Sequence, residues 1–366
     1  NTTLSNDVTW DHKIYIDDNV TVTIDKGATL DITTVDVIFG QCAKLLFKDG
    51  ATIRATNSVF RPCDINGTWS GVIFNQTNLP AKGVINECIF KNAGNAINIY
   101  SQIPQKETDI RITNNLFSNC AVGIYVFNIK LNKGITGNTF KVDEDAPSST
   151  NCYSNSFTGI SASSTLFNTN ISQNDFINNR ENKSFVGINT NNVEKAEISS
   201  NHFTNNNPAI TSGYSKNIDI ENNDFETNKF FDKVEAQIST GYLTVSRIIN
   251  NRFYNSSRNN KLSPSRIPAI SMYYGSILNI KQNNISNFET GIQTKGIDNS
   301  NISENNIKDC WYFGISNENP KNVDVACNVI NMEPFGDRNS IGISTINSLY
   351  SNLPAWEWNK IRGNER

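Results

Sequence analysis

The sequence predicts an all-β solenoid, a chain wound into successive coils that each hold three short strands. The first observation behind this prediction is a motif, Ile-x-x-Asn-x-Phe, that returns along the chain. The second is a small residue followed by Ile, placed so that this Ile precedes the Ile of the next motif by 10 or 11 residues. The third is the period, which is 22 to 28 residues and longer where segments are inserted. A fixed local pattern at such a period is typical of solenoids.

The strands of one coil follow from these two motifs. The copies of the first are Ile112–Asn115–Phe117, Ile135–Asn138–Phe140, Ile171–Asn174–Phe176, Ile198–Asn201–Phe203, Ile220–Asn223–Phe225, Ile248–Asn251–Phe253, Ile280–Asn283–Ile285, Ile302–Asn305–Ile307 and Val325–Asn328–Ile330. The copies of the second include Gly123–Ile124, Gly159–Ile160, Gly187–Ile188, Ala209–Ile210, Ala269–Ile270, Gly291–Ile292, Gly314–Ile315 and Gly342–Ile343. Since side chains alternate along a strand, the Ile and Phe residues are expected to point inward. Each coil then has a first strand with the small residue and Ile, a second strand leading to the Asn, and a third strand with the Phe.

The repeat also predicts the domain organisation. Because each coil contacts only its neighbours, the array grows without a new core, and we expect a single domain over residues 1–366. The segments 27–32 and 50–55 repeat 23 residues apart in the less regular N-terminal part. We therefore expect coils over residues 20–346.

Both ends of such an array would expose unpaired strand edges, so both need caps. We expect residues 1–19, with Trp10, to form the N-terminal cap region. Residues 347–366, with Trp356 and Trp358, are expected to form the C-terminal cap region.

The Asn of the motif is expected where the chain turns between two strands, since Asn tolerates a left-handed φ. Stacked on successive coils, the side-chain amides can bond to one another as an internal ladder. A buried polar column survives only if every amide is paired. In the coil before Asn115, Cys88 occupies the Asn position, so the ladder is expected to end there.

The bulk composition excludes several partners. The net charge is −3 and there is no basic stripe, so nucleic acid is not an expected partner. No apolar run reaches the length of a membrane span, so membrane insertion is not expected either. Only two histidines, His12 and His202, are present, and we expect neither a metal nor a cofactor. Nothing in the sequence specifies the oligomeric state.

Seven cysteines are present without a CxxC pair. Cys63, Cys120 and Cys310 each lie three residues after the Phe or Ile of the third strand, where another coil has Ala93. A position that accepts Cys or Ala indicates a small buried site. We expect inert core thiols in preference to disulfides.

These coils resemble the right-handed parallel β-helix of the pectate-lyase-like superfamily, over roughly residues 20 to 350. The opening, with Trp10, the segments 20–24 and 27–30, and Trp69, is similar to the start of secreted and surface β-helix proteins of Bacteroidetes. The resemblance implies a polysaccharide or glycan partner held on the first-strand face. It also implies an extracellular or cell-surface location, and the absence of an initial Met is consistent with a removed leader.

Insertions between the third strand of one coil and the first strand of the next are expected to form a wall beside the first-strand face. They lie at 141–157, 178–185, 229–236 and 254–267, and they carry many charges. Asp143, Glu144 and Asp145 are candidate catalytic carboxylates because glycoside hydrolysis needs two facing carboxylates and β-elimination needs a base with a cation. The alternative is an ordinary polar surface.

Two outward columns also stand out. Asp175, His202, Asp224 and Arg252 follow the motif Asn on four consecutive coils and are either an acid–base cluster or paired charges on a solvated strand. Tyr214, Tyr242 and Tyr274 each lie four residues after the Ile of the first strand. They are expected to stack, either as a carbohydrate-binding row or only as a stabilising ladder.

The sequence therefore leaves three functions open. The first-strand residues that follow the inward Ile include no Asp, Glu, Lys, Arg or His, which disfavours catalysis on that face. They are Asn98, Tyr125, Ser161, Asn189, Thr211, Ser239, Ser271, Gln293, Ser316 and Ser344. The leading hypothesis is a secreted or cell-surface protein that binds polysaccharide without catalysis. The alternatives are a polysaccharide lyase or glycoside hydrolase acting beside the loops, and a structural stalk or adhesin.

Overall fold

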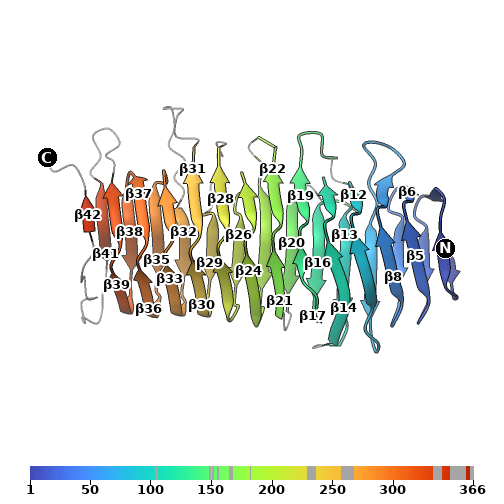
Figure 1. Cartoon of the computed structure of the whole chain (residues 1–366), viewed down its shortest axis with the longest axis horizontal. Coiled ribbons are helices and arrows are strands. Elements are labelled where there is room, and N and C mark those ends of the chain that lie inside the picture. Colours follow the sequence, from blue (N-terminus) through green and yellow to red (C-terminus); the bar gives the residue numbers. More distant parts are fainter. Residues whose placement is uncertain are drawn as a thin grey trace. The chain divides into compact units, whose positions relative to one another are not determined.

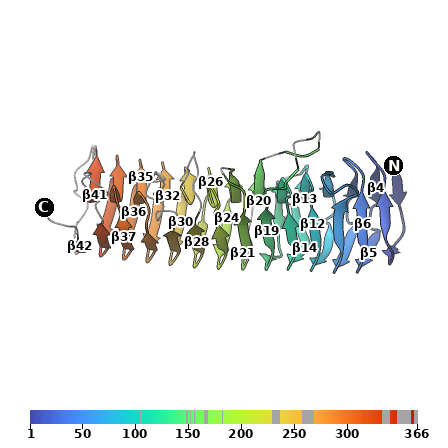
Figure 2. The same cartoon turned by 90° about the horizontal axis from the view of Figure 1, so that it is seen from above.

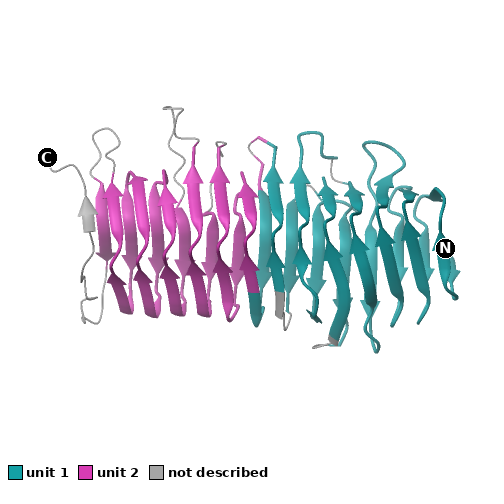
Figure 3. Cartoon of the chain, viewed as in Figure 1, with its two compact units in different colours: residues 1–180, 185–196 teal, residues 181–184, 197–366 magenta. Residues whose placement is uncertain are grey.

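The computed structural model describes residues 1–103, 106–147, 150, 152–154, 156–164, 168–181, 183–228, 236–256, 268–332, 340–346 and 360–362. The chain divides into two compact units (Figure 3). Unit 1 contains residues 1–180 and 185–196, and unit 2 contains residues 181–184 and 197–366.

Unit 1 is built from three parallel sheets, each with one strand from every coil (Figure 1). The first sheet contains β1 (Thr2–Leu4), β4 (Thr21–Ile24), β7 (Lys44–Phe47), β10 (Gly71–Gln76), β13 (Asn95–Ser101), β16 (Val122–Phe127), β20 (Phe157–Ser163) and β23 (Phe185–Asn191). The second contains β2 (Val8–Trp10), β5 (Thr29–Thr33), β8 (Thr52–Thr56), β11 (Lys82–Asn86), β14 (Lys106–Thr113), β18 (Ile135–Thr136) and β21 (Asn168–Ser172), with β17 (Ile129–Leu131) beside β14. The third contains β3 (Ile14–Ile16), β6 (Asp36–Phe39), β9 (Val59–Pro62), β12 (Ile89–Lys91), β15 (Leu116–Ser118), β19 (Thr139–Val142) and β22 (Asp175–Asn178).

Unit 2 repeats this arrangement of parallel strands (Figure 2). The boundary between the units lies within β24 (Lys195–Ser199). The first sheet of unit 2 contains β26 (Ile210–Gly213), β29 (Ile238–Gly241), β32 (Pro268–Tyr273), β35 (Thr290–Lys295), β38 (Phe313–Glu318) and β41 (Ile341–Ile346). Its second contains β27 (Ile218–Glu221), β30 (Thr244–Ile249), β33 (Ser276–Lys281), β36 (Asp298–Ser303) and β39 (Lys321–Ala326). Its third contains β25 (His202–Thr204), β28 (Asp224–Thr227), β31 (Arg252–Asn255), β34 (Asn284–Ser286), β37 (Asn306–Cys310), β40 (Val329–Met332) and β42 (Lys360–Arg362).

The fold is therefore the predicted right-handed parallel β-helix with three strands per coil. Residues 1–19, expected as a cap, form three short strands that pair in parallel with β4, β5 and β6. Apart from β42, the expected C-terminal cap region 347–366 lies outside the described residues, and Trp356 and Trp358 lie there with it. The single domain over 1–366 stays a prediction.

The interior is filled by columns of like side chains, as the motif predicts. In unit 1, neighbouring rings of Phe60, Phe90, Phe117, Phe140 and Phe176 stack with centroids 4.7 to 5.1 Å apart. In unit 2 the rings of Phe203, Phe225 and Phe253 stack at 4.8 and 4.5 Å, and Ile continues the column. All these rings are buried, so each coil buries its apolar surface against the next.

The asparagine ladder is present in both units. In unit 1 the side-chain oxygen of Asn138 accepts the backbone N–H and the side-chain amide of Asn115, each at 3.0 Å. The amide of Asn138 in turn donates to the carbonyl of Ile112 at 3.1 Å. Asn115 binds the backbone N–H of Cys88 in the same way, so the amide column ends there as expected. The buried members in unit 2 are Asn201, Asn223, Asn251, Asn283, Asn305 and Asn328.

One detail of the ladder differs from the prediction. The left-handed residue at the turn is the residue before the ladder Asn, for example Asn114 (φ 56°) and Asn250 (φ 56°). The chain therefore turns on one residue, and the following Asn directs its side chain inward.

The cysteines fulfil the prediction only in part. Cys88, Cys120 and Cys310 are buried free thiols, and burial raises the pKa of Cys88 to about 11 and that of Cys120 to about 12. The prediction was wrong for Cys63, which is exposed because it begins the exposed segment 63–66 after β9. Trp69 takes the interior position instead, pairing with Ala93 and stacking on Phe39 at 3.9 Å. It was also wrong for Cys42 and Cys152, which form a disulfide.

Candidate functional site

The three tyrosines form a column at the turn between the first and second sheets of unit 2. Tyr214 follows β26, Tyr242 follows β29 and Tyr274 follows β32. The Tyr214 and Tyr242 rings stack at 4.7 Å with 5° between their planes, and the Tyr242 and Tyr274 rings at 5.4 Å with 21°. The side chains are 64%, 49% and 50% exposed in that order, so the predicted stack lies on the surface.

The backbone of these tyrosines is left-handed, with φ of 50°, 57° and 54°. A bulky side chain at such a φ is uncommon and is disfavoured by about 1 kcal/mol or more. Other turns of the chain carry left-handed residues that suit this backbone better, such as Gly296 and Asn319 in the next two coils. Each tyrosine N–H donates to a carbonyl of the following coil at 2.8 to 3.0 Å, which holds the turn. Tyrosine therefore occupies these three turns although Gly or Asn would adopt the left-handed φ with less backbone strain.

The stacking determines which parts of the rings solvent can reach. Each ring covers a face of its neighbour, and a Cβ built on Gly296 would lie 2.7 Å from the Tyr274 ring, so this ring also lies close to the next coil. The column therefore presents ring edges and a row of hydroxyl groups. Such a row can hydrogen-bond to hydroxyl-rich ligands and contact their apolar C–H surfaces.

One neighbouring feature was not predicted from the sequence. Val245 and Ile277, three residues after Tyr242 and Tyr274, are also exposed and also have positive φ. Their signal in the sequence is the repeat Tyr-x-Thr-Val and Tyr-x-Ser-Ile on consecutive coils. It was missed because an isolated exposed apolar residue is ordinary on a protein surface.

The predicted charged column forms ion pairs within unit 2. Arg252 and Asp224 form a bidentate pair, with Nε to Oδ1 at 2.8 Å. His202 Nδ1 lies 3.4 Å from Asp224 Oδ2, and its Nε2 lies 3.0 Å from Thr204 Oγ1. The hydrogen bond and charge of Asp224 raise the pKa of Arg252. The structure therefore brings His202, Asp224 and Arg252 together in unit 2. The fourth predicted residue, Asp175, belongs to unit 1.

The acidic residues of the 141–157 loop bind groups of the protein itself. Asp143 pairs with Lys141 at 3.0 Å and accepts a hydrogen bond from the Asn179 amide at 2.6 Å. Asp145 accepts a hydrogen bond from the amide of Asn119 at 3.2 Å. Glu144 is exposed. The contacts of Asp143 and Asp145 fix the loop to neighbouring coils.

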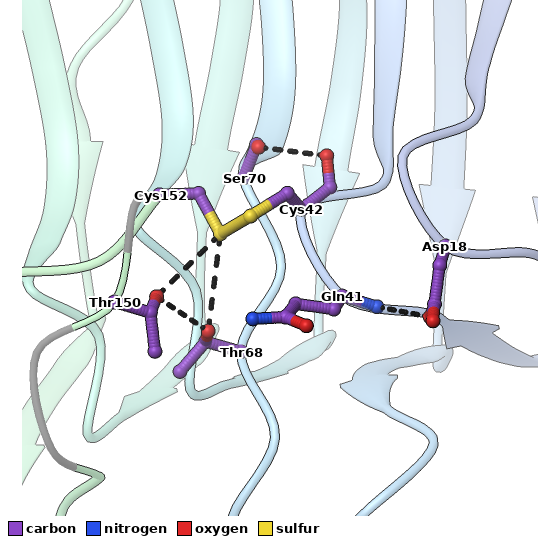
Figure 4. The surroundings of a disulfide bond; sticks show 7 residues. All are labelled: Asp18, Gln41, Cys42, Thr68, Ser70, Thr150 and Cys152. Atoms are coloured by element: carbon purple, nitrogen blue, oxygen red, sulfur yellow. Dashed lines mark hydrogen bonds between the residues drawn. A yellow bond between two sulfur atoms is a disulfide. The ribbon is translucent and has the colours of Figure 1, made fainter.

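The same loop is fastened by the disulfide to an earlier coil (Figure 4). Thr150 and Thr68 share a hydrogen bond of 2.9 Å beside the Cys42–Cys152 bridge. Tyr153 is buried, and its hydroxyl donates to the carbonyl of Asn119 at 2.8 Å. We call residues 143–156 the strap.

The other predicted wall loops are only partly within the described structure. Residues 229–235 and 257–267 lie outside the described residues, as does residue 182. In the 178–185 segment, the Arg180 guanidinium lies 4.9 Å from the centre of the Phe157 ring. The wall of four loops therefore stays a prediction.

Across the described part of the chain, no group of three metal-binding side chains comes together. Over the same residues, no helix is long and apolar enough to cross a membrane.

The first-sheet face has the predicted uncharged row next to the inward Ile residues. Most of its residues are half-buried, while Ser271 and Ser316 are buried. The class of protein that this architecture defines is therefore a right-handed parallel β-helix with an uncharged first-sheet face.

Comparison with known proteins agrees with that class. No protein-family model matches the chain, and no curated protein matches its sequence. A mutant of the periplasmic alginate epimerase AlgG is similar in structure, with a TM-score of 0.50 and 10% identity over 90% of this chain and 77% of the epimerase. Tailspike protein 3 of bacteriophage CBA120 has a TM-score of 0.47 and 11% identity over 94% of this chain and 55% of the tailspike. The surface adhesin PfbA of Streptococcus pneumoniae has a TM-score of 0.39 and 12% identity over 83% and 82%. At 10% identity the similarity to the epimerase shows the fold alone, and one fold hosts many functions.

Proposed function

We propose that the protein binds polysaccharide at the tyrosine column and does not cleave it. The observation that carries this proposal is the placement of Tyr214, Tyr242 and Tyr274 at left-handed turn positions. A strained backbone kept on three successive coils suggests that the side chains serve something beyond the turn. A row of exposed phenols repeated once per coil suits a ligand that is itself a repeating, hydroxyl-rich polymer.

The chemistry of the described carboxylates supports binding over cleavage. Hydrolysis of a glycosidic bond uses two carboxyl groups facing each other across the substrate. Asp224 is occupied by Arg252, and Asp143 by Lys141 and Asn179. Each of these two carboxylates is therefore engaged by cationic or amide groups of the protein itself.

A secreted or cell-surface location is part of the same proposal. Disulfides persist in oxidising compartments and are rare in the cytosol. The Cys42–Cys152 bridge is consistent with a protein that meets extracellular glycans.

The test compares the wild-type protein with the triple variant Tyr214→Asn, Tyr242→Asn, Tyr274→Asn on immobilised polysaccharides. Asn suits a left-handed φ, so the variant should fold. We expect at least a tenfold loss of affinity, while Tyr15→Asn, which removes an exposed tyrosine of unit 1, should bind as the wild type does.

The products are checked in the same samples. Wild-type protein should release neither new reducing ends nor unsaturated sugars from any bound polymer. Release of either would show a hydrolase or lyase and overturn the non-catalytic part of the proposal. Failure of the wild type to retain any polysaccharide would overturn the binding function and favour a stalk.

A further inference from the structure

We infer that Val245 and Ile277 form a second row of the same binding surface, and that this surface selects a neutral polysaccharide lying along the direction in which the coils stack. This inference rests on the proposed function and adds to it the ligand class and the ligand's orientation.

The two residues are neighbours in space as well as in register. Thr244 pairs with Ser276 and Ser246 with Leu278 in adjacent parallel strands, which places Val245 beside Ile277. Their side chains are 49% and 55% exposed. The row therefore runs beside the tyrosine column, one residue per coil, like the column itself.

The backbone at these two positions is unfavourable for the residues that occupy it. Val245 has a φ of 51° and Ile277 a φ of 55°. A β-branched residue in the left-handed region is a genuine outlier. At the same register, the coils on either side have Asn217, Asn299 and Asn322, which suit the region far better. Two strained, exposed, apolar residues between asparagines are better explained by a ligand contact than by the fold.

A strip of surface lies between the tyrosine column and the row of Val245 and Ile277. It is uncharged only in the coils of Tyr242 and Tyr274, where both rows are present. It carries hydroxyl groups at Thr244 and Ser276. In the coils beyond, the same strip has Lys216 on one side, and Asp298 paired with Lys321 at 3.7 Å on the other. The centre of the surface thus combines phenol edges, two hydroxyls and two aliphatic side chains, with charges only at its margins. An exposed apolar patch with a polar rim is the usual form of a binding site.

The repeat points to the kind of occupant. Ring centroids in the column are 4.7 and 5.4 Å apart, and strands of neighbouring coils are spaced similarly. An extended polymer presents the same groups again at each residue, so it can contact both rows on successive coils. A neutral sugar offers C–H surface to the aliphatic row and hydroxyls to the strip, and it leaves no buried charge unpaired.

The test uses the double variant Val245→Asn, Ile277→Asn, which installs the residue that the neighbouring coils carry. This variant should melt at the wild-type temperature or above it, because Asn relieves the backbone strain. Its matched control is Val84→Asn, another exposed valine, which lies on β11 in unit 1. The probes are immobilised neutral polymers (β-glucan, mannan and xylan) and acidic ones (alginate and pectate).

We expect the wild type and the control to bind a neutral polymer equally, and the double variant to bind it at least tenfold more weakly. Added salt should leave the wild-type affinity unchanged. Unchanged binding by the double variant would overturn the inference alone, as would a wild type that binds only acidic polymers and is released by salt. A wild type that binds no polymer would overturn the proposed function and, with it, the inference.

Discussion

Two consecutive residues perform two different tasks at each ladder turn. In one coil of unit 2, Asn250 has the left-handed φ of 56° and turns the chain, while the buried Asn251 bonds to the coils on both sides. Asn251 accepts from Asn223 and donates to the carbonyl of Ile220 at 2.8 Å. Substitutions at these adjacent asparagines should therefore have very different effects.

We expect Asn251→Ala to lower the free energy of unfolding by about 3 kcal/mol, because it removes the acceptor of the buried Asn223 N–H and side-chain amide and the side-chain donor to the carbonyl of Ile220. Asn250→Gly is the control and should be close to neutral, since Gly accepts positive φ. Urea unfolding of both variants measures the difference. Equal effects of the two substitutions would show that the ladder bonds do not stabilise the fold.

The buried thiols predict a loss of stability at alkaline pH. Burial raises the pKa of Cys120 from 9.0 to about 12, so the unfolded chain loses this proton first as the pH rises. The stabilisation is complete below pH 9 and disappears as the pH rises through about 12. Its full size is on the order of 4 kcal/mol, from about 1.4 kcal/mol per pKa unit.

Cys120→Ala tests this directly, because the preceding coil already has Ala93 at the same position. The variant should lose less stability than the wild type between pH 8 and pH 11 in urea unfolding. Parallel losses in the two proteins would contradict a buried, protonated thiol.

At this scale the sequence predicts the interior well and the surface poorly. The ladder asparagines and stacked phenylalanines could be predicted because burial repeats the same requirement in every coil. Val245 and Ile277 could not, because their special feature is a positive φ, which an apolar pattern does not report. The stacking of the tyrosines was predictable from register, but the hiding of their ring faces depends on geometry that only the structure supplies.

Among the elements of unit 1, the strap is the one held by a covalent bond to a distant coil. The bridge joins residues 110 apart in the sequence. It is supported by the Thr68–Thr150 hydrogen bond and the buried Tyr153. The loop's length and position could be read from the repeat spacing, but the disulfide could not, because its two cysteines have no shared local pattern.

We expect Cys42→Ser with Cys152→Ser to lower the stability of unit 1 by roughly 2 to 4 kcal/mol, because the unfolded chain is no longer cross-linked. The strap should then be cut faster by protease, while the coils remain resistant. Limited proteolysis with mass spectrometry measures this, and Cys63→Ser, which removes an exposed free thiol, is the control. Equal strap cleavage in all three proteins would show that the bridge does not hold the loop.

At the scale of the whole molecule, both units are built from the same coil and the same ladder. A formal charge of −3 on 366 residues gives no strong overall field. Neither feature assigns a function.

We expect a chelator such as EDTA to leave both the melting temperature and polysaccharide binding unchanged. The reason is that the described residues bring no three metal-binding side chains together. Calorimetry and a binding assay, each with and without added Ca²⁺, measure this. A rise in melting temperature with Ca²⁺ that EDTA reverses would reveal a metal site.

The asparagine ladder has a direction. Within each unit the side-chain oxygen of every later member accepts the N–H of the asparagine one coil nearer the N-terminus, as Asn223 does for Asn201 and Asn305 for Asn283. A coil's own turn is therefore completed only when the next coil is laid on it. During synthesis the Asn N–H groups without an acceptor would always lie on the most recently made coil. Assembly can therefore follow the order of translation, because each new coil supplies the acceptor for the coil before it.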